Sequence, residues 1–315
     1  LIKTGGGLLQ LSAGNAFTGN VDLQEGGLAL GNNNALSTGT LTIGDDTFLT
    51  ATATRTLTNA YTVSGDFALR GVFNLALNGS GTLASGGHNI SVDSTLNILT
   101  LGGVLSGATS DITKSGNGIL VLGSANIYGG TTTVADGVLR YGVVNAVPTG
   151  TALSVLAGGL LDITNGGSAI TVGSLAGDSA IAGGVISTTA TSGTVTFTSG
   201  ANDTSTAFGG VIMNAAGSTL NFVKTGTGTL TLGGANTYIG STTVVNGRLV
   251  AKAVGGNSPL GTSQALVLGG GSTSGILQLG DNAAALNHTF TSLSTAGSGT
   301  LNKIVSGNAS MATLT

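Results

Sequence analysis

Two stretches of the chain are nearly the same, and they decide the fold. The first runs from Gly116 to Arg140 and reads GNGILVLGSANIYGGTTTVADGVLR. The second runs from Gly226 to Val250 and reads GTGTLTLGGANTYIGSTTVVNGRLV. A more diverged copy, GGGLLQLSAGNAFTGNVDLQEGGLA, occupies residues 5–29. Self-similarity at a fixed period is typical of repeat architectures, so the sequence favours a stacked array over an ordinary globular core.

A lysine precedes each copy, and its position measures the period. Lys3, Lys114 and Lys224 recur about every 110 residues, and a constant spacing of this kind is what a repeat array produces. We therefore predict a single domain, residues 1–315, made of internal repeats at 1–111, 112–221 and 222–315, the last of them incomplete. Because the chain starts and stops inside a repeat, we expect a fragment of a longer array whose ends can associate.

Apolar and variable positions alternate within each copy. Leu120 and Leu122 have apolar counterparts in the other two copies, while the position between them changes from Gln10 to Val121 to Thr231. A period of two indicates strands with one buried face. Three short strands with Gly or Asn at each corner fit in about 22 residues, which is one rung of a three-sided coil. The sequence therefore predicts an all-β solenoid of roughly 14 rungs.

The composition agrees with this fold and limits the possible partners. Glycine supplies 57 of 315 residues, only 7% are charged, and the mean hydropathy of +0.42 argues against disorder. A net charge of −3 cannot neutralise nucleic-acid phosphates. Two isolated histidines and no cysteine predict no metal centre, disulfide or cofactor. The uncharged stretch 142–161 contains Asn145 and Pro148, so we expect no membrane span.

The third copy resembles the autotransporter-associated β-strand repeat of type V secretion passengers. Gly226 to Val244 matches it most closely, and Gly116 to Leu139 matches nearly as well. The resemblance implies a right-handed parallel β-helix that lies outside the cell or on the outer surface of a Gram-negative cell. The repeat motif places structural residues at Asn15, Phe17, Gly19, Asn126, Tyr128, Gly130, Asn236, Tyr238 and Gly240.

The motif side chains allow a functional and a structural interpretation. Asn126 and Tyr128 could form a platform on which a glycan stacks, or a corner aromatic and a turn-capping amide. The first copy has Phe17 in place of the tyrosine, which favours the structural interpretation. We expect stacked asparagines to form side-chain ladders. We interpret Lys114 and its counterparts as solvated charges that discourage sideways strand pairing.

Acidic residues decide whether the chain could be an enzyme. Pectinases and phage tailspikes also use β-helices, and their chemistry needs clustered carboxylates. The only pair close in sequence is Asp45 and Asp46, and the others are scattered singly. Thr-x-Thr pairs are frequent but irregularly spaced, which argues against ice binding. We therefore predict no catalytic residue and no enzymatic activity.

The function that the sequence supports best is a non-enzymatic surface rod of an autotransporter-like passenger. It would act as an adhesin shaft or as a self-associating surface fibre. The alternatives are a subunit of an extracellular filament or matrix stacked end to end and, less favoured, a polysaccharide-cleaving β-helix enzyme. The expected partners are further copies of the chain, and host or abiotic surfaces or glycans.

Overall fold

The chain folds as a parallel β-solenoid, as the repeats predicted. The computed structural model describes residues 1–178, 183–252, 258–262 and 265–309, and it has no helix among them. There are about 12 turns, against the roughly 14 predicted. The chain divides into two compact units, Leu1–Pro148 (unit 1) and Thr149–Thr315 (unit 2). The predicted third repeat, 222–315, ends in residues 310–315, which lie outside the described residues.

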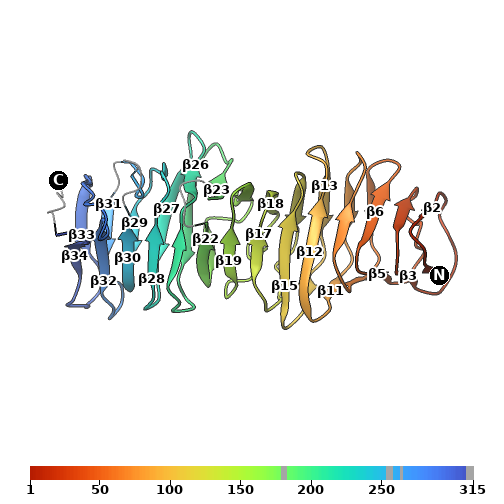
Figure 1. Ribbon diagram of the computed structural model, residues 1–315, viewed down its shortest axis with the longest axis horizontal. Helices are drawn as coiled ribbons and strands as arrows, with labels where there is room; N and C mark the ends of the chain where they lie inside the picture. The colour runs from red at the N-terminus through yellow and green to blue at the C-terminus, as the bar shows by residue number, and fades with distance from the viewer. Residues whose placement is uncertain (179–182, 253–257, 263–264, 310–315) are drawn as a thin grey trace. The chain divides into compact units, whose positions relative to one another are not determined.

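Unit 1 winds its strands into three parallel sheets, A, B and C (Figure 1). Sheet A contains β1 (Ile2–Lys3), β3 (Val21–Leu23), β5 (Leu41–Ile43), β8 (Tyr61–Val63), β11 (Gly81–Leu83) and β14 (Leu105–Ser106). Sheet B contains β2 (Leu8–Leu11), β4 (Gly27–Leu30), β6 (Thr47–Ala51), β9 (Phe67–Leu69), β12 (Gly86–Val92), β15 (Ser110–Ser115) and β17 (Thr132–Val134). Sheet C contains β7 (Arg55–Leu57), β10 (Leu75–Leu77), β13 (Ile98–Leu101), β16 (Ile119–Leu122) and β18 (Gly137–Tyr141).

Unit 2 contains parallel strands on the same plan. Two short groups come first: β19 (Ala152–Val155) with β22 (Ser174–Gly177), and β20 (Gly159–Asp162) with β23 (Val185–Thr188) and β26 (Val211–Asn214). Sheet D contains β21 (Ala169–Val172), β24 (Thr194–Ser199), β27 (Thr219–Lys224), β29 (Thr242–Val244), β31 (Ala265–Leu268) and β33 (Ser292–Thr295). Sheet E contains β25 (Thr206–Phe208), β28 (Thr229–Leu232), β30 (Gly247–Ala251), β32 (Gly275–Leu279) and β34 (Lys303–Ser306).

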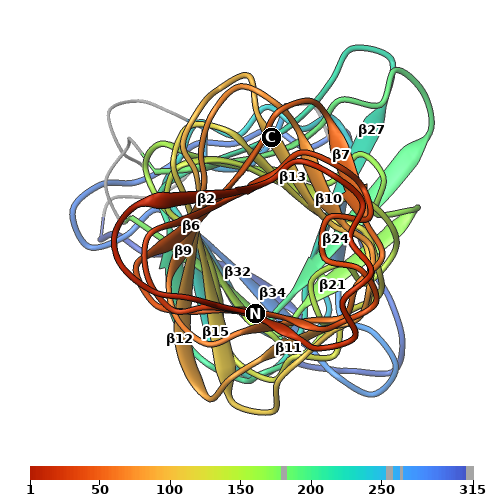
Figure 2. The same ribbon diagram turned by 90° about the vertical axis from the view of Figure 1, so that its right-hand side faces the viewer.

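Side chains of every second strand residue fill the inside of each unit. The strands of unit 1 surround that interior on three sides in Figure 2. Leu120 and Leu122 are buried in β16, while Val121 between them is half-buried, as the period of two predicted. Turn length varies more than the motif suggested: Leu8 pairs with Gly27 one turn on, whereas Arg248 pairs with the more distant Ile276. Because some turns contain more residues than predicted, the chain forms fewer turns than predicted.

Corner glycines let successive turns approach each other closely. Gly116 and Gly137 lie at the same corner of adjacent turns, and both have positive φ, 70° and 61°. A Cβ on Gly137 would come within 2.3 Å of the carbonyl oxygen of Gly116. Only glycine combines this backbone conformation with that approach. Among the described residues, no helix is long and apolar enough to cross a membrane.

Asparagine and aspartate side chains link neighbouring turns, but not as the predicted side-chain ladders. At several corners their Oδ1 atoms accept hydrogen bonds from backbone N–H groups one turn further along the chain. Asn20 accepts from Thr40 at 3.0 Å, and Asn74 accepts from Ile98 at 2.9 Å. The corner backbone leaves N–H groups without a sheet partner, and a short side-chain acceptor satisfies them.

The sequence motif does not keep to one side of the coil. In the first copy the strands that follow each other, β1 and β2, belong to sheets A and B. In the second copy the equivalent strands, β15 and β16, belong to sheets B and C of the same unit. The interval from Lys3 to Lys114 therefore corresponds to a number of whole turns plus about one third of a turn. Side chains that are equivalent in sequence thus lie on different faces of unit 1.

Candidate functional site

The three motif lysines lie inside the solenoid, which contradicts the interpretation of them as solvated surface charges. The exposed fractions of Lys3, Lys114 and Lys224 are 9%, 0% and 1%. Lys114 is the fifth residue of β15, and its side chain points to the interior with those of Ser110 and Ile112. Alternation along the strand therefore places the ammonium inside, where a charge needs partners.

Each ammonium finds those partners in backbone carbonyl groups at two stacked corners. The Nζ atom of Lys114 donates to the carbonyl oxygens of Ser115 (2.6 Å) and Gly116 (2.7 Å) in its own corner. It also donates to the carbonyl of Asp136 (3.0 Å) in the next turn. The other two lysines repeat this arrangement, Lys224 with Thr225, Gly226 and Asn246, and Lys3 with Thr4, Gly5 and Glu25. We call each of these a lysine clip.

Burial makes the ammonium form of Lys114 and Lys224 less favourable than in water. It lowers the pKa of Lys114 from 10.5 to about 8, against the opposing effect of the Asp136 and Asp93 carboxylates. The pKa of Lys224 falls likewise to about 8, opposed by Asp203. The three carbonyl oxygens use all three donors of the ammonium. The clip is thus a saturated structural site rather than a free nucleophile.

The motif asparagines hold three turns together. Asn126 is buried, its Oδ1 accepts from the N–H of Leu105 (2.8 Å), and its Nδ2 donates to the carbonyl of Ala146 (2.7 Å). These partners lie one turn before and one turn after it. Asn236 makes the same pair of bonds with Ile212 and Pro259, and Asn15 donates to Ala35. The side-chain amide of each of these asparagines lies in the motif loop, where the hydrogen bonds of the sheet are interrupted.

The motif tyrosines are buried, and each hydroxyl pairs with a threonine of the following strand. Tyr128 Oη lies 2.8 Å from Thr132 Oγ1, and Tyr238 Oη lies 2.8 Å from Thr242 Oγ1. Burial raises the pKa of the Tyr128 hydroxyl well above its ordinary 10.0. The Tyr238 ring packs on Phe222, with 6.2 Å between the ring centroids. A ring enclosed in this way offers no platform for a glycan.

The first copy differs at both members of this pair. Phe17 replaces the tyrosine and Val21 replaces the threonine, so both hydroxyls are lost together. Phe17 and Asn15 are half-buried there, and Val21 is buried. The sequence analysis missed the threonine partner, although this joint replacement was a signal for it. An unpaired buried hydroxyl is costly, whereas a matched apolar pair is not.

The motif glycines also differ between the first copy and the other two. A Cβ on Gly130 would lie 2.3 Å from the carbonyl oxygen of Ser110, and one on Gly240 would lie 2.2 Å from that of Leu220. Around Gly19 no atom lies within 4 Å of such a Cβ. In the second and third copies the motif loop therefore crosses directly over the backbone of the previous turn.

The three lysine clips and the motif loops lie in segments that a family model recognises. The model of the passenger-associated-transport-repeat matches residues 1–30, 112–140 and 222–251. The chain carries three passenger-associated-transport-repeats. The resemblance found in the sequence is confirmed, and repeats of this kind are associated with autotransporter passengers, which are secreted or lie on the cell surface. No curated protein and no solved structure matches the chain.

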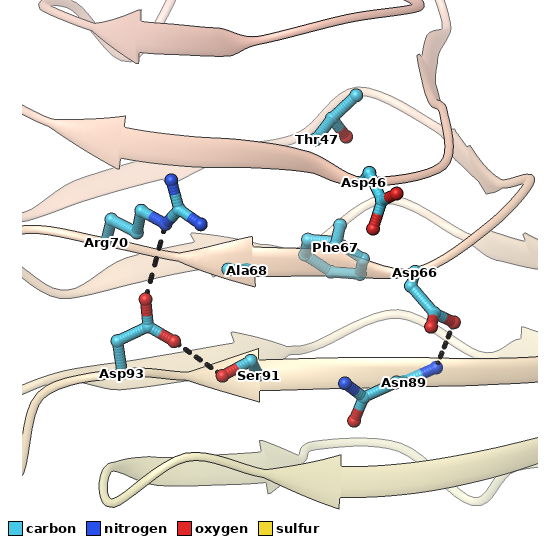
Figure 3. Close-up of a pocket in the computed structure, with 9 residues that line it drawn as sticks. All are labelled: Asp46, Thr47, Asp66, Phe67, Ala68, Arg70, Asn89, Ser91 and Asp93. Carbon is cyan, nitrogen blue, oxygen red and sulfur yellow. Dashed lines mark hydrogen bonds and ion pairs between the residues drawn. The ribbon is translucent and has the colours of Figure 1, made fainter.

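Outside the transport repeats, unit 1 gathers polar side chains that the sequence analysis treated as scattered. Figure 3 shows Asp46, Asp66 and Asn89 on one side of a depression, and Arg70 and Asp93 on the other. They come from or adjoin β6, β9 and β12, which are neighbours in sheet B. The step along the chain from Asp46 to Asp66 is shorter than the step from Asp66 to Asn89, because the turns differ in length.

Most of these charged groups already have partners. Asp66 Oδ1 accepts from the N–H of Asn89 at 2.7 Å. Asp93 accepts from Ser91 Oγ at 2.5 Å and pairs with Arg70 Nε at 3.3 Å. Among the residues that the structure describes, no three His, Cys, Asp or Glu side chains are placed to hold a metal ion. The arrangement provides hydrogen-bonding groups around a recess, and the fold and repeats point to a structural role for the chain.

Proposed function

We propose that the chain is a section of the structural shaft of an autotransporter passenger, without catalytic activity, whose transport repeats secure the winding of the solenoid. It would support or form an adhesive element at the cell surface. The observation that carries the proposal is the lysine clip, which occurs three times at buried positions and bonds only to backbone carbonyl groups of its own corner and of the next turn.

The clip joins turns in a way that suits a passenger. Lys114 donates to the carbonyl of Asp136 in the following turn. In a solenoid each turn contacts mainly its neighbours, so winding can propagate from any formed stretch. Each clip stabilises the contact between its two turns whichever of them forms first. The chain has no cysteine that could form disulfides before export.

Surface display of clip variants tests this proposal. The chain would be placed between the signal peptide and the membrane barrel of a well-behaved autotransporter, and protease would be added to intact cells. We expect the chain to be cleaved from outside, and the double variant Lys114→Met/Lys224→Met to reach the surface several-fold less. Lys303→Met, which changes an exposed lysine, is the control. A chain that never becomes accessible, or a double variant displayed like the parent, would contradict the proposal.

Self-association is a second candidate role, and one surface of unit 1 favours it. Val104, Ile127 and Val144 are exposed apolar residues, with 43%, 68% and 47% of their surface accessible. Hydrogen bonds from Ile127 N–H to Leu105 and from Asn126 N–H to Asn145 place them in three consecutive turns. Burying such a row between copies would be favourable.

Light scattering over a wide concentration range tests the association. We expect the apparent mass to rise with concentration, and the rise to weaken in Ile127→Thr, since Thr237 occupies the equivalent position in the third copy. A chain that stays monomeric throughout would leave only the shaft role.

A further inference from the structure

The third lysine clip differs from the first two in the residue whose carbonyl receives the lysine in the next turn. That residue is Glu25 in the first clip, Asp136 in the second and Asn246 in the third. A glycine with positive φ follows it in every copy, at 71°, 61° and 68°. The third copy therefore places an asparagine directly before a glycine at this corner. In such a pair the side-chain amide can react with the next backbone nitrogen.

The backbone nitrogen of Gly247 is directed at the side chain of Asn246. Its N–H donates to Asn246 Oδ1 at 2.8 Å. Because Oδ1 is bonded to Cγ, the nitrogen lies beside the carbon that it would attack to close a five-membered ring. Holding two reacting groups in such an arrangement greatly accelerates their reaction. Glycine also has no Cβ that would crowd this approach.

The clip favours loss of the proton from this nitrogen. The Nζ atom of Lys224 donates to the carbonyl oxygen of Asn246 at 3.3 Å, and that carbonyl belongs to the same peptide group as the Gly247 nitrogen. When the nitrogen loses its proton, resonance carries part of the negative charge onto this oxygen. A positively charged donor aimed at the oxygen stabilises the charge as it develops.

Water can reach the corner where the reaction would take place. Asn246 and Gly247 are both half-buried. Together with Thr227, Ser272 and Ser274 they line a surface recess of about 390 Å³. The recess admits the water that must open the ring, and it gives the ammonia that leaves a way out.

Two other asparagine–glycine pairs provide an internal comparison. Asn117 and Asn165 are exposed, whereas Asn246 is half-buried. The N–H groups of the glycines that follow them, Gly118 and Gly166, donate to backbone carbonyl oxygens of other residues at 2.7 and 3.1 Å. Neither nitrogen is therefore directed at the asparagine before it. Exposure alone would make these two pairs the more reactive, while the geometry favours Asn246.

We propose that Asn246 is a self-modification site that loses its amide nitrogen with the help of the lysine clip. The Gly247 nitrogen gives up its proton and forms a bond to Cγ, the Cγ–Nδ2 bond breaks, and the amide nitrogen takes up the proton and leaves as ammonia. One water molecule then opens the succinimide and leaves a carboxylate at residue 246, in aspartyl or isoaspartyl linkage. The third clip thereby gains the acid that the first two carry at this position. The inference does not use the shaft role, and its failure would leave that role intact.

Site-specific deamidation rates of the intact chain test the proposal. The purified chain is incubated at mildly alkaline pH, folded in buffer and unfolded in guanidinium chloride, and peptide mass spectrometry follows the conversion of Asn246, Asn117 and Asn165. We expect Asn246 to convert at least about tenfold faster than the other two in the folded chain, and faster there than in the unfolded chain. A smaller difference in the folded chain, or faster conversion of Asn246 in the unfolded chain, would overturn the proposal.

The variant Lys224→Met tests the part that the clip plays. It should slow the conversion of Asn246 at least about threefold and leave that of Asn165, in the same unit, unchanged. Lys303→Met changes an exposed lysine of this unit and is the matched control, which should react like the parent. An unchanged rate at Asn246 in Lys224→Met would also overturn the proposal. If circular dichroism shows that Lys224→Met is unfolded, the comparison of the folded and unfolded parent chain decides.

Discussion

The Nζ atom of Lys114 donates a hydrogen bond to the carbonyl oxygen of Asp136, at 3.0 Å, across the boundary between two turns. The side chain is fully buried, and its two other hydrogen bonds close the corner from which it starts. A buried charge stabilises a fold only where its partners are complete. The clip meets this condition with backbone atoms alone, so it depends little on which side chains surround the corner.

Replacing a clip lysine should destabilise the unit that contains it. In Lys224→Met three buried carbonyl groups lose their donor, which costs about 1–3 kcal/mol each, while the cost of burying the charge disappears. We expect a net loss of about 2–4 kcal/mol in the free energy of unfolding, measured by urea titration. The control Lys303→Met lies in the same unit, is exposed, and should change it by less than about 0.5 kcal/mol. Equal losses of unfolding free energy in the two variants would refute the stabilising role of the clip.

Stability should rise with pH between about 8 and 10 and fall again above 10. The pKa of Lys114 and Lys224 is about 8 in the folded chain and 10.5 as the ordinary value, so the unfolded state binds more protons in this range. The cost of burying the two ammonium groups is therefore full below pH 8, decreases as the pH rises, and has disappeared above 10.5. The pKa of Tyr128 is raised above 10.0, so its contribution is lost as the pH rises beyond that value.

Unfolding curves at a series of pH values measure this maximum. The rise from pH 8 to 10 should amount to roughly 1–3 kcal/mol per lysine, since one pKa unit corresponds to about 1.4 kcal/mol. In the variant Lys114→Met/Lys224→Met the rise should disappear. If the stability of the parent chain declined steadily from pH 8 upward, the carbonyl groups would stabilise the ammonium form more than burial destabilises it.

Asn126 should tolerate no change of its amide. In Asn126→Asp the Nδ2 donor becomes an oxygen that faces the carbonyl of Ala146, and a charge is buried. We expect a loss of about 2–4 kcal/mol in the free energy of unfolding. Asn117→Asp changes an exposed residue of the same unit and is the control. Hydrogen exchange should also show faster exchange at the amide of Leu105, which donates to Asn126 Oδ1.

The strands and the parallel stacking could be predicted because buried positions recur every second residue and corners carry glycine. Leu120 and Leu122 show this pattern without any tertiary information. The clip could not be predicted in the same way. A lysine is usually exposed, and the carbonyl groups that make Lys114 tolerable inside belong to backbone that the sequence does not display.

The depression escaped prediction for a different reason. Asp46, Asp66 and Asn89 align only after the chain has wound, and the turns between them contain unequal numbers of residues. The rotation of the motif from sheets A and B to sheets B and C has the same origin. Local pattern determines which residues point inwards, whereas accumulated turn lengths determine which face a residue joins.

The hydroxyl pair of the second copy offers the sharpest test, because the first copy already contains the alternative. Tyr128→Phe leaves the Thr132 hydroxyl buried without its partner, and Thr132→Val does the same to the tyrosine; both residues are almost fully buried. We expect each single variant to lose about 1–2 kcal/mol of unfolding free energy. The double variant recreates the combination of Phe17 and Val21 and should recover most of that loss. A double-mutant cycle, with unfolding followed by circular dichroism, gives the coupling energy. Additive losses would mean that the two hydroxyls act separately, and that their joint absence from the first copy has no energetic cause.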